Sequence, residues 1–253
     1  MLLRRLQCER LEISVYETRA QLGEASAARF AQRLRRVLGE QGRASVIFAS
    51  APSQNEFTAA LRQVDVDWSR VTAFHMDEYV GLAEDHPESF RRYIREHLLD
   101  HVPIGAFHGI RGEAADPEAE SARYAALLAG HPPALVALGI GENGHLAFMD
   151  PPVCDFHDPL DVKVVELDQV CRMQQVHDGC FPRFEDVPTH AISLTVPVFL
   201  RTAHTVVSVP GPTKRAAVKA AIQGPVTTAC PASILRQHAD AELFLNKESA
   251  EWI

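Results

Sequence analysis

Two segments of this sequence carry side chains that could transfer protons. Asp77 and Glu78 are adjacent carboxylates. Asn143, His145 and Asp150 lie together in a glycine-rich stretch. Alone, each has a commoner structural explanation: a helix cap for the acidic pair, a buried structural histidine, or a turn-forming aspartate before two prolines. Together they favour general acid–base catalysis, because a histidine can both donate and accept a proton near neutral pH.

Two other segments could bind an anion such as a phosphate group. Thr213 and Lys214 follow Gly211 at the predicted start of a helix, where backbone amides, a hydroxyl and a cation would meet. Ser50 and Ser53 offer hydroxyls in a turn after a predicted strand. A lysine in the first turn of a helix is usually a solvent-facing charge, so Lys214 alone predicts little. The combined set favours proton transfer on a small phosphorylated compound, with no metal-ligand cluster and no pattern for a nucleophilic serine or cysteine.

The glycine-rich stretch contains a literal G-x-G-x-x-G at Gly139, Gly141 and Gly144. In dinucleotide-binding sites this pattern follows a strand and opens a helix, whose N-terminus holds the pyrophosphate. The apolar run 134–138 predicts the strand, but the two prolines at 151–152 leave no room for the helix. We therefore expect a strand end that displays side chains, and no cofactor.

Strand-like and helix-like segments alternate along the chain and must position these residues. Apolar runs predict strands at 11–15, 45–48, 71–74, 134–138, 162–165, 192–196, 205–209 and 242–245. Helical periodicity predicts helices at 17–40, 55–63, 87–99, 120–129, 214–222 and 232–238. The alternation predicts an α/β fold: one domain over residues 1–253, doubly wound, with a mostly parallel, modified Rossmann-like sheet and helices on both faces. The segment at about 150–190 holds one predicted strand and is expected to form a lid or binding loop.

The predicted strands also bring the reactive side chains to one place. Ligands of open α/β sheets bind outside the carboxyl ends of the strands. Ser50, Asp77, His145 and Lys214 each follow a different predicted strand. We therefore expect one site at the carboxyl edge of the sheet.

The overall composition excludes several classes of function. The chain is 46% apolar and 23% charged, so a sizeable core can form, and its formal net charge of −8 argues against binding nucleic acid or anionic membranes. Five scattered cysteines without a C-x-x-C spacing predict reduced thiols, neither a zinc ribbon nor a disulfide framework. The first residues lack a signal-peptide pattern, and no apolar run could span a membrane. We therefore expect a cytoplasmic protein whose partner is a small molecule; a homo-oligomer is compatible with the sequence.

Several motifs resemble those of the glucosamine-6-phosphate deaminases, whose superfamily includes 6-phosphogluconolactonase. The matching segments are FHMDEYVGL at 74–82, GIGENGHLAF at 139–148, and residues 86–90, 187–191, 211–214 and 231–235. The resemblance implies an aldose–ketose isomerase and deaminase. Such an enzyme converts a hexosamine 6-phosphate, here expected to be glucosamine 6-phosphate, to a ketose 6-phosphate plus ammonia without a cofactor.

The resemblance also implies roles for individual residues. Asp77 would move a proton between C2 and C1 of the opened sugar, His145 would be the acid–base group of ring opening, and Lys214 would bind the phosphate. Asn143 and Asp150 occupy the other two ring-opening positions. The expected substrate- and phosphate-binding residues are Ser50, Ser53, Glu78, Gly144, Thr213 and Lys214.

The chain departs from the family pattern at three places. Asn143 and Asp150 stand where the family has Asp and Glu, serines replace the glycines and threonine after the second strand, and Asp178 stands where the family has a phosphate-binding arginine. We expect Asn143 to accept a hydrogen bond from the His145 ring without contributing a charge. Two alternative functions stay open: a 6-phosphogluconolactonase-type hydrolase, and a non-catalytic sugar-phosphate sensing module. The second usually carries an N-terminal helix-turn-helix, for which there is no room before the first predicted strand.

Overall fold

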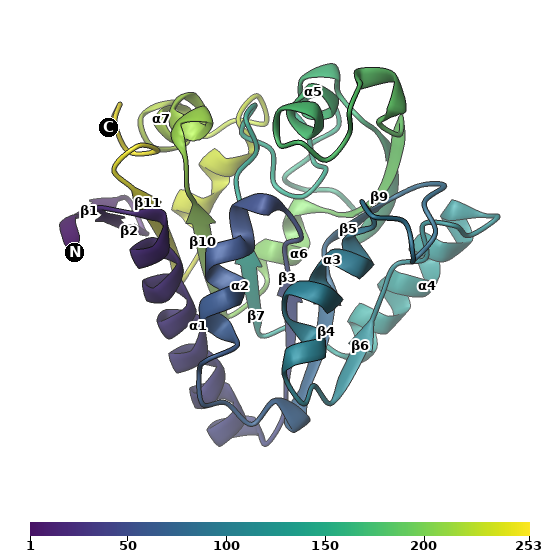
Figure 1. Cartoon of the computed structure of the whole chain (residues 1–253), viewed down its shortest axis with the longest axis horizontal. Coiled ribbons are helices and arrows are strands. Elements are labelled where there is room, and N and C mark those ends of the chain that lie inside the picture. Colours follow the sequence, from purple (N-terminus) through teal and green to yellow (C-terminus); the bar gives the residue numbers. More distant parts are fainter.

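The computed structural model describes all 253 residues and is built around an eight-stranded sheet (Figure 1). The strands lie in the order β1-β2-β11-β10-β7-β3-β4-β6. Their bounds are β1 Leu2–Cys8, β2 Leu11–Tyr16, β3 Ala44–Phe48, β4 Val71–His75, β6 Ala106–His108, β7 Leu135–Leu138, β10 His204–Val209 and β11 Ala241–Asn246. Every neighbouring pair is parallel except β1 with β2. The predicted mostly parallel sheet is therefore confirmed.

Helices cover both faces of this sheet, as predicted. One hydrophobic cluster joins the sheet to α1 (Arg19–Gln41), α2 (Asn55–Leu61) and α3 (Phe90–His97). A second cluster joins the opposite face to α4 (Pro117–Gly130), α6 (Val196–Leu200) and α7 (Arg215–Gln223). Successive strand residues contribute to opposite clusters: Val46 and Phe48 to the first, Ile47 to the second. This alternation is the period-two geometry of a strand buried on both faces.

The longest helix, α1, shows how local sequence sets the boundaries of an element. The Thr18 hydroxyl accepts a hydrogen bond from the backbone N–H of Gln21 at its start. At its end Gly42 adopts the left-handed conformation, with φ of 77°, and its N–H donates to the Leu38 carbonyl. The buried stripe between these caps contains Phe30 and Leu34, so the predicted apolar face is confirmed.

A smaller antiparallel sheet lies beside the main one. It consists of β5 (Asp77–Tyr79), β9 (His190–Leu194) and β8 (Val162–Glu166), in that order. The strands predicted at 162–165 and 192–196 therefore exist but lie outside the parallel sheet. The sequence did not predict the exposed edge strand β1, the short elements β5, β6 and α6, or the helix at Gln169–His177. The segment predicted as a helix at 232–238 is a 3-10 helix at Pro231–Gln237.

The segment at 150–190 contains more regular structure than the sequence predicted. In addition to β8 it holds a helix, α5 (Gln169–His177), which begins where the Asp168 side chain accepts a hydrogen bond from the Val170 N–H. α5 lies above the carboxyl edge of the main sheet (Figure 1). Its mixed sequence, QVCRMQQVH, has no clear apolar stripe, which explains why periodicity did not reveal it.

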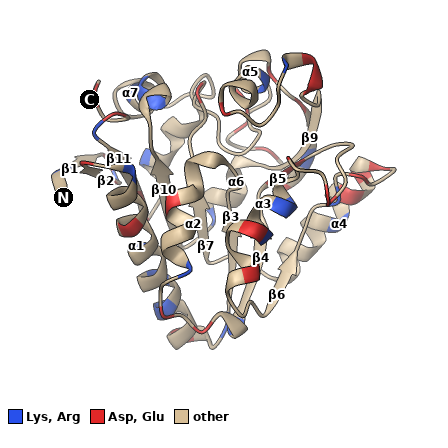
Figure 2. Cartoon of the chain, in the orientation of Figure 1, with Lys and Arg blue, Asp and Glu red and all other residues tan.

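Charged side chains are absent from the centre of the main sheet. The four central strands β10, β7, β3 and β4 contain no Lys, Arg, Asp or Glu, and charges appear only beyond their ends (Figure 2). None of the helices combines the length and the apolar character needed to cross a bilayer.

Candidate active site

A cavity opens at the carboxyl ends of the four central strands. These strands are neighbours in the sheet, and the chain runs from β3 outward to β4 and β6 before it returns to β7 on the other side of β3. Such a reversal of strand order leaves a crevice where ligands of α/β proteins bind. The cavity is lined by five of the residues predicted from the sequence: Ser50, Ser53, Asp77, His145 and Lys214. The fold therefore brings together side chains that are far apart in the sequence.

The backbone of the glycine-rich loop after β7 packs against the ring of His145. The Gly141 N–H donates to the His145 carbonyl, and the Gly144 N–H donates to the Gly141 carbonyl, both at 3.0 Å. A Cβ atom on Gly141 would lie 2.2 Å from two ring atoms of His145, so only glycine permits this packing. Gly144 has a φ of 86° and packs against Cys230. Gly144 does not line the cavity, and its predicted role as a substrate ligand stays a prediction.

The partner of the His145 ring is Asp150. The ring Nδ1 lies 2.9 Å from the Asp150 Oδ1, close but not aligned as a hydrogen bond, which leaves Nε2 as the nitrogen available to the cavity. Burial acts to raise the pKa of Asp150, but its contacts with His145, the Asn143 amide and the Asp168 N–H outweigh burial and lower this pKa. Asp150 is therefore an ionised carboxylate behind the histidine.

Asn143 does not bind the His145 ring, so that expectation was wrong. Its side-chain oxygen accepts a hydrogen bond from the backbone N–H of His145 at 3.0 Å. Its amide nitrogen donates to Asp150 at 2.9 Å and to Asp168 at 3.3 Å. Asn143 lies outside the cavity lining. It positions Asp150, and as a donor it satisfies two carboxylates that an aspartate in its place would repel.

Asp77 lies at the cavity in a setting that makes its carboxylate basic. Only 7% of the residue is exposed, and the residue lines the cavity. Burial, and then the negative charge of Glu78, raise the pKa of Asp77 well above its ordinary value. A carboxyl group with a raised pKa in a cleft is characteristic of a general base.

Glu78 points away from Asp77 because successive side chains of a strand, here β5, face opposite directions. Its buried carboxylate accepts hydrogen bonds from the Ser89 hydroxyl and the N–H groups of Tyr79, Phe90 and Arg91, at 2.9–3.1 Å. It thus holds the first turn of α3. Glu78 does not line the cavity, and its carboxylate contacts the start of α3, so none of its contacts supports its predicted role in substrate binding.

The opposite side of the cavity is suited to an anion. Lys214 is 4% exposed, and burial lowers the pKa of its ammonium group, an effect that the charges of Asp178 and Glu142 oppose. The Ser50 hydroxyl is buried at the cavity and has no hydrogen-bond partner in the protein. A buried hydroxyl without a partner is costly, so a ligand atom is its natural acceptor. Thr213 is exposed and lies outside the cavity, and its predicted role in phosphate binding stays a prediction.

Sequence reasoning missed the residues that α5 and its end bring to the cavity. These are Gln174, Gln175 and Asp178. The Gln174 side chain links this segment to the glycine-rich loop: its oxygen accepts from the Glu142 N–H at 2.7 Å, and its nitrogen donates to Asp178 at 3.2 Å. The only signal in the sequence was the expectation that the segment at 150–190 covers a site. The segment reaches the cavity at these three positions, and its role as a lid stays a prediction.

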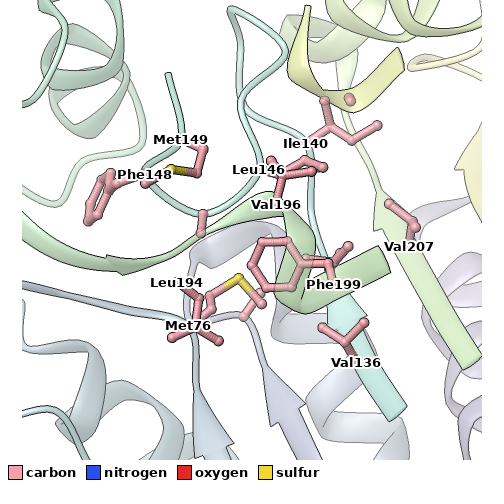
Figure 3. Close-up of a cluster of buried hydrophobic side chains, with 14 of the residues drawn as sticks. Met76, Val136, Ile140, Leu146, Phe148, Met149, Leu194, Val196, Phe199 and Val207 are labelled. Carbon is pink, nitrogen blue, oxygen red and sulfur yellow. The ribbon is translucent and has the colours of Figure 1, made fainter. Parts of the chain in front are cut away.

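Apolar packing beneath the cavity anchors both acid–base candidates. Met76 precedes Asp77 and Leu146 follows His145; both are buried in a cluster that includes Phe199 of α6 (Figure 3). Because the neighbours of Asp77 and His145 are held in a close-packed core, the backbone at both positions is fixed. The cavity wall is completed by Met76, Phe90, Ile140, Ala147 and Phe148.

The fold and the cavity define an α/β protein with an aspartate, a histidine and a buried lysine in one cavity at the carboxyl edge of a parallel sheet. The chain belongs to the family described as glucosamine-6-phosphate isomerases/6-phosphogluconolactonase, whose model matches residues 17–245. It is 34% identical over 239 residues to the glucosamine-6-phosphate deaminase of Bacillus cytotoxicus, a match that covers 94% of this chain and 88% of that protein. The deaminase of Listeria innocua is 38% identical over 202 residues, covering 80% and 84%.

Solved structures show the same fold. A monomeric glucosamine-6-phosphate deaminase superimposes with a TM-score of 0.86 at 25% identity, covering 95% of this chain and 99% of that one. The 6-phosphogluconolactonase of Trypanosoma brucei superimposes with a TM-score of 0.78 at 19% identity, covering 98% and 99%. The second likeness concerns the fold alone.

Proposed function

We propose that the protein is an aldose–ketose isomerase and deaminase that converts a hexosamine 6-phosphate, glucosamine 6-phosphate in particular, to a ketose 6-phosphate plus ammonia. The observation that carries this proposal is the buried, basic Asp77 carboxylate in one cavity with His145 and Lys214. Curated relatives at 34–38% identity that bear the deaminase name support it.

Ring opening requires a group that moves a proton from the C1 hydroxyl to the ring oxygen of the sugar. His145 can do this through Nε2, because its other nitrogen lies against Asp150. The Asp150 carboxylate stabilises the ring when it carries a second proton. Asn143 keeps Asp150 in place through its 2.9 Å hydrogen bond. In this proposal Asp150 and Asn143 are positioning residues.

Isomerisation requires a base that removes the proton from C2 of the opened sugar and returns it to C1. Asp77 has the required character, since burial raises its pKa and so its affinity for a proton. C2 then becomes an imine carbon, and water displaces the nitrogen as ammonia to leave the ketone. The pH dependence should accordingly show a rate that rises as the Asp77 carboxyl loses its proton.

The phosphate would bind between Lys214 and the unpartnered Ser50 hydroxyl. This end of the cavity is away from the reacting carbons, so its contacts contribute mainly to substrate binding. The cavity volume is about 60 Å³, whereas pockets for small molecules measure roughly 300–1,000 Å³. Entry of a sugar phosphate therefore requires residues that line the cavity to move outward.

The fold and the family description also support a second candidate, hydrolysis of 6-phosphogluconolactone. That reaction also needs a general base, directed at an attacking water and not at C2, so it is the deaminase name of the curated relatives that favours the first candidate. The deciding experiment supplies aminosugar phosphates and the lactone in parallel and measures ammonia release and lactone loss. We expect ammonia, and with a substrate deuterated at C2 we expect the deuterium to appear at C1 of the ketose. Lactone hydrolysis without ammonia would refute the proposal.

A further inference from the structure

The cavity has little positive charge for a site that binds phosphate. Lys214 is the only lysine or arginine among the residues that line it, and two of the lining residues are acidic, Asp77 and Asp178. Asp178 reaches the cavity from the end of α5. A doubly charged phosphate group is usually bound by several donors, and by arginine in particular. The charges in this cavity thus differ from those expected of a site for a dianion.

No arginine lines the cavity, and the arginines of the neighbouring segments are engaged elsewhere. Arg172 donates to two backbone carbonyls, and its guanidinium lies 4.1 Å from the centre of an aromatic ring. Arg19, at the start of α1, donates to both carboxylate oxygens of Glu56 at 2.7 and 3.1 Å. Arg183 is exposed and pairs with an acidic neighbour. Lys214 is therefore the one fixed positive charge that a bound anion would meet.

Two carboxylates act on the Lys214 ammonium group without pairing with it. Burial lowers the pKa of Lys214, and the charges of Asp178 and then Glu142 oppose this shift. Asp178 accepts a hydrogen bond from the Gln174 amide at 3.2 Å. Glu142 lies 3.3 Å from the His177 ring. Two negative charges thus already oppose the single positive charge before a ligand binds.

We propose that Asp178 is a specificity-determining residue that selects a hexosamine whose 6-ester carries one negative charge and discriminates against the doubly charged phosphate. The second charge of a dianion is attracted by one lysine but repelled by Asp178 and Glu142. Its removal from water into a buried site also costs more than that of the first charge. Two esters share the selected chemistry: a 6-sulfate, and a 6-phosphate that retains one proton. The identity of the sugar rests on the proposed function.

The binding test compares two ligands of different charge and needs no turnover. The open-chain amino alcohol of glucosamine, esterified at O6 with phosphate or with sulfate, is titrated by calorimetry at pH 8. At this pH the phosphate is doubly charged, because its second pKa is about 6, and the sulfate is singly charged. The wild type should bind the sulfate at least as tightly as the phosphate.

Asp178→Asn should tighten binding of the phosphate more than binding of the sulfate. Each negative charge of the ligand that faces Asp178 should cost roughly 10-fold in affinity, so the gain should be roughly 100-fold for the phosphate and roughly 10-fold for the sulfate. Asparagine keeps an oxygen that can accept the hydrogen bond from Gln174. The matched control is Glu142→Gln, which removes an equal charge that acts on Lys214 from outside the cavity lining. Its affinity ratio should change less.

Wild-type protein that binds the phosphate roughly 10-fold more tightly than the sulfate would overturn the proposal, and this comparison needs no variant to fold. The wild-type affinity ratio in Asp178→Asn, or an equal change in Glu142→Gln, would also overturn it. Ammonia release from the two glucosamine esters separates the two sources of the singly charged group: release from the 6-sulfate identifies the sulfate ester, and release from the 6-phosphate alone identifies the monoprotonated phosphate. No ammonia from either ester, with the expected affinities, would count against the proposed function and leave the charge selectivity standing.

Discussion

Replacing Asp77 by asparagine should abolish turnover and at the same time make the folded protein more stable at neutral pH. Burial and the charge of Glu78 raise the pKa of Asp77 in the folded state, whereas in the unfolded chain the group ionises near its ordinary value of 3.8. As the pH rises above that value, the carboxyl group ionises in the unfolded chain but stays protonated in the folded protein. Ionisation therefore stabilises the unfolded chain, and Asp77 lowers the free energy of unfolding as the pH rises. Asparagine has the same shape and no charge to bury.

The gain in the free energy of unfolding depends on how far the pKa of Asp77 is raised in the folded state. Each unit of elevation corresponds to about 1.4 kcal/mol of unfolding free energy. For a chain of this length about 1 kcal/mol shifts Tm by about 2–4 °C, so each unit should raise Tm by about 3–5 °C. Below the ordinary pKa of aspartate both states are protonated and the gain should vanish. Because a general base acts on the transition state, kcat should fall by roughly 10²- to 10⁴-fold or more.

The assay combines thermal unfolding at several pH values, kinetics, and calorimetry with a non-reacting open-chain amino-alcohol phosphate. The analogue should still bind to Asp77→Asn. The matched control is Glu78→Gln: its carboxylate accepts hydrogen bonds from three backbone N–H groups, including that of Arg91 at the start of α3, and from the Ser89 hydroxyl. Burial raises the pKa of Glu78 too, but the amide nitrogen of glutamine cannot accept the hydrogen bonds that Oε2 receives from the Ser89 hydroxyl and the Arg91 N–H, so this variant should have a lower Tm. A lower Tm for Asp77→Asn at neutral pH, or a normal rate at saturation with analogue binding lost, would refute the reasoning.

Three further substitutions test other parts of the site. Lys214→Ala should raise KM for the phosphorylated substrate by roughly 10- to 150-fold, with a smaller effect on kcat, as expected for a charge-assisted contact away from the reacting carbons; inorganic phosphate protecting wild type and variant equally from thermal unfolding would contradict this. Gly141→Ala should lower kcat by roughly 10²-fold, because its Cβ would lie 2.2 Å from the His145 ring and displace it; an unchanged kcat would show that the ring position is unimportant. Asn143→Asp should slow turnover and lower Tm, because a third carboxylate would face Asp150 and Asp168 in place of a donor at 2.9 and 3.3 Å; a faster variant with a normal Tm would indicate that Asn143 limits ring opening.

The sequence by itself determined the parts of this protein that depend on local pattern. Apolar runs located β3, β4, β7 and β10, because a strand buried on both faces must be apolar throughout. The rule that ligands bind beyond the carboxyl ends of parallel strands then located Ser50, Asp77, His145 and Lys214, which line one cavity. Two prolines sufficed to exclude a dinucleotide-binding helix, and the structure has no helix there.

Only the tertiary structure decided which neighbours of these residues face the cavity and which side chains meet. Asp77 and Glu78 both carry a carboxyl group. Because they are successive residues of β5, which pairs with β9, Asp77 faces the cavity and Glu78 faces the start of α3. Asn143 contacts the backbone of His145 because Asp150 occupies the position beside the ring. Gln174 and Gln175 reach the cavity on α5, a helix with no clear periodic pattern. Burial, pKa and ligand geometry depend on atoms distant in sequence, and periodicity reports only the conformation of a residue and its nearest neighbours along the chain.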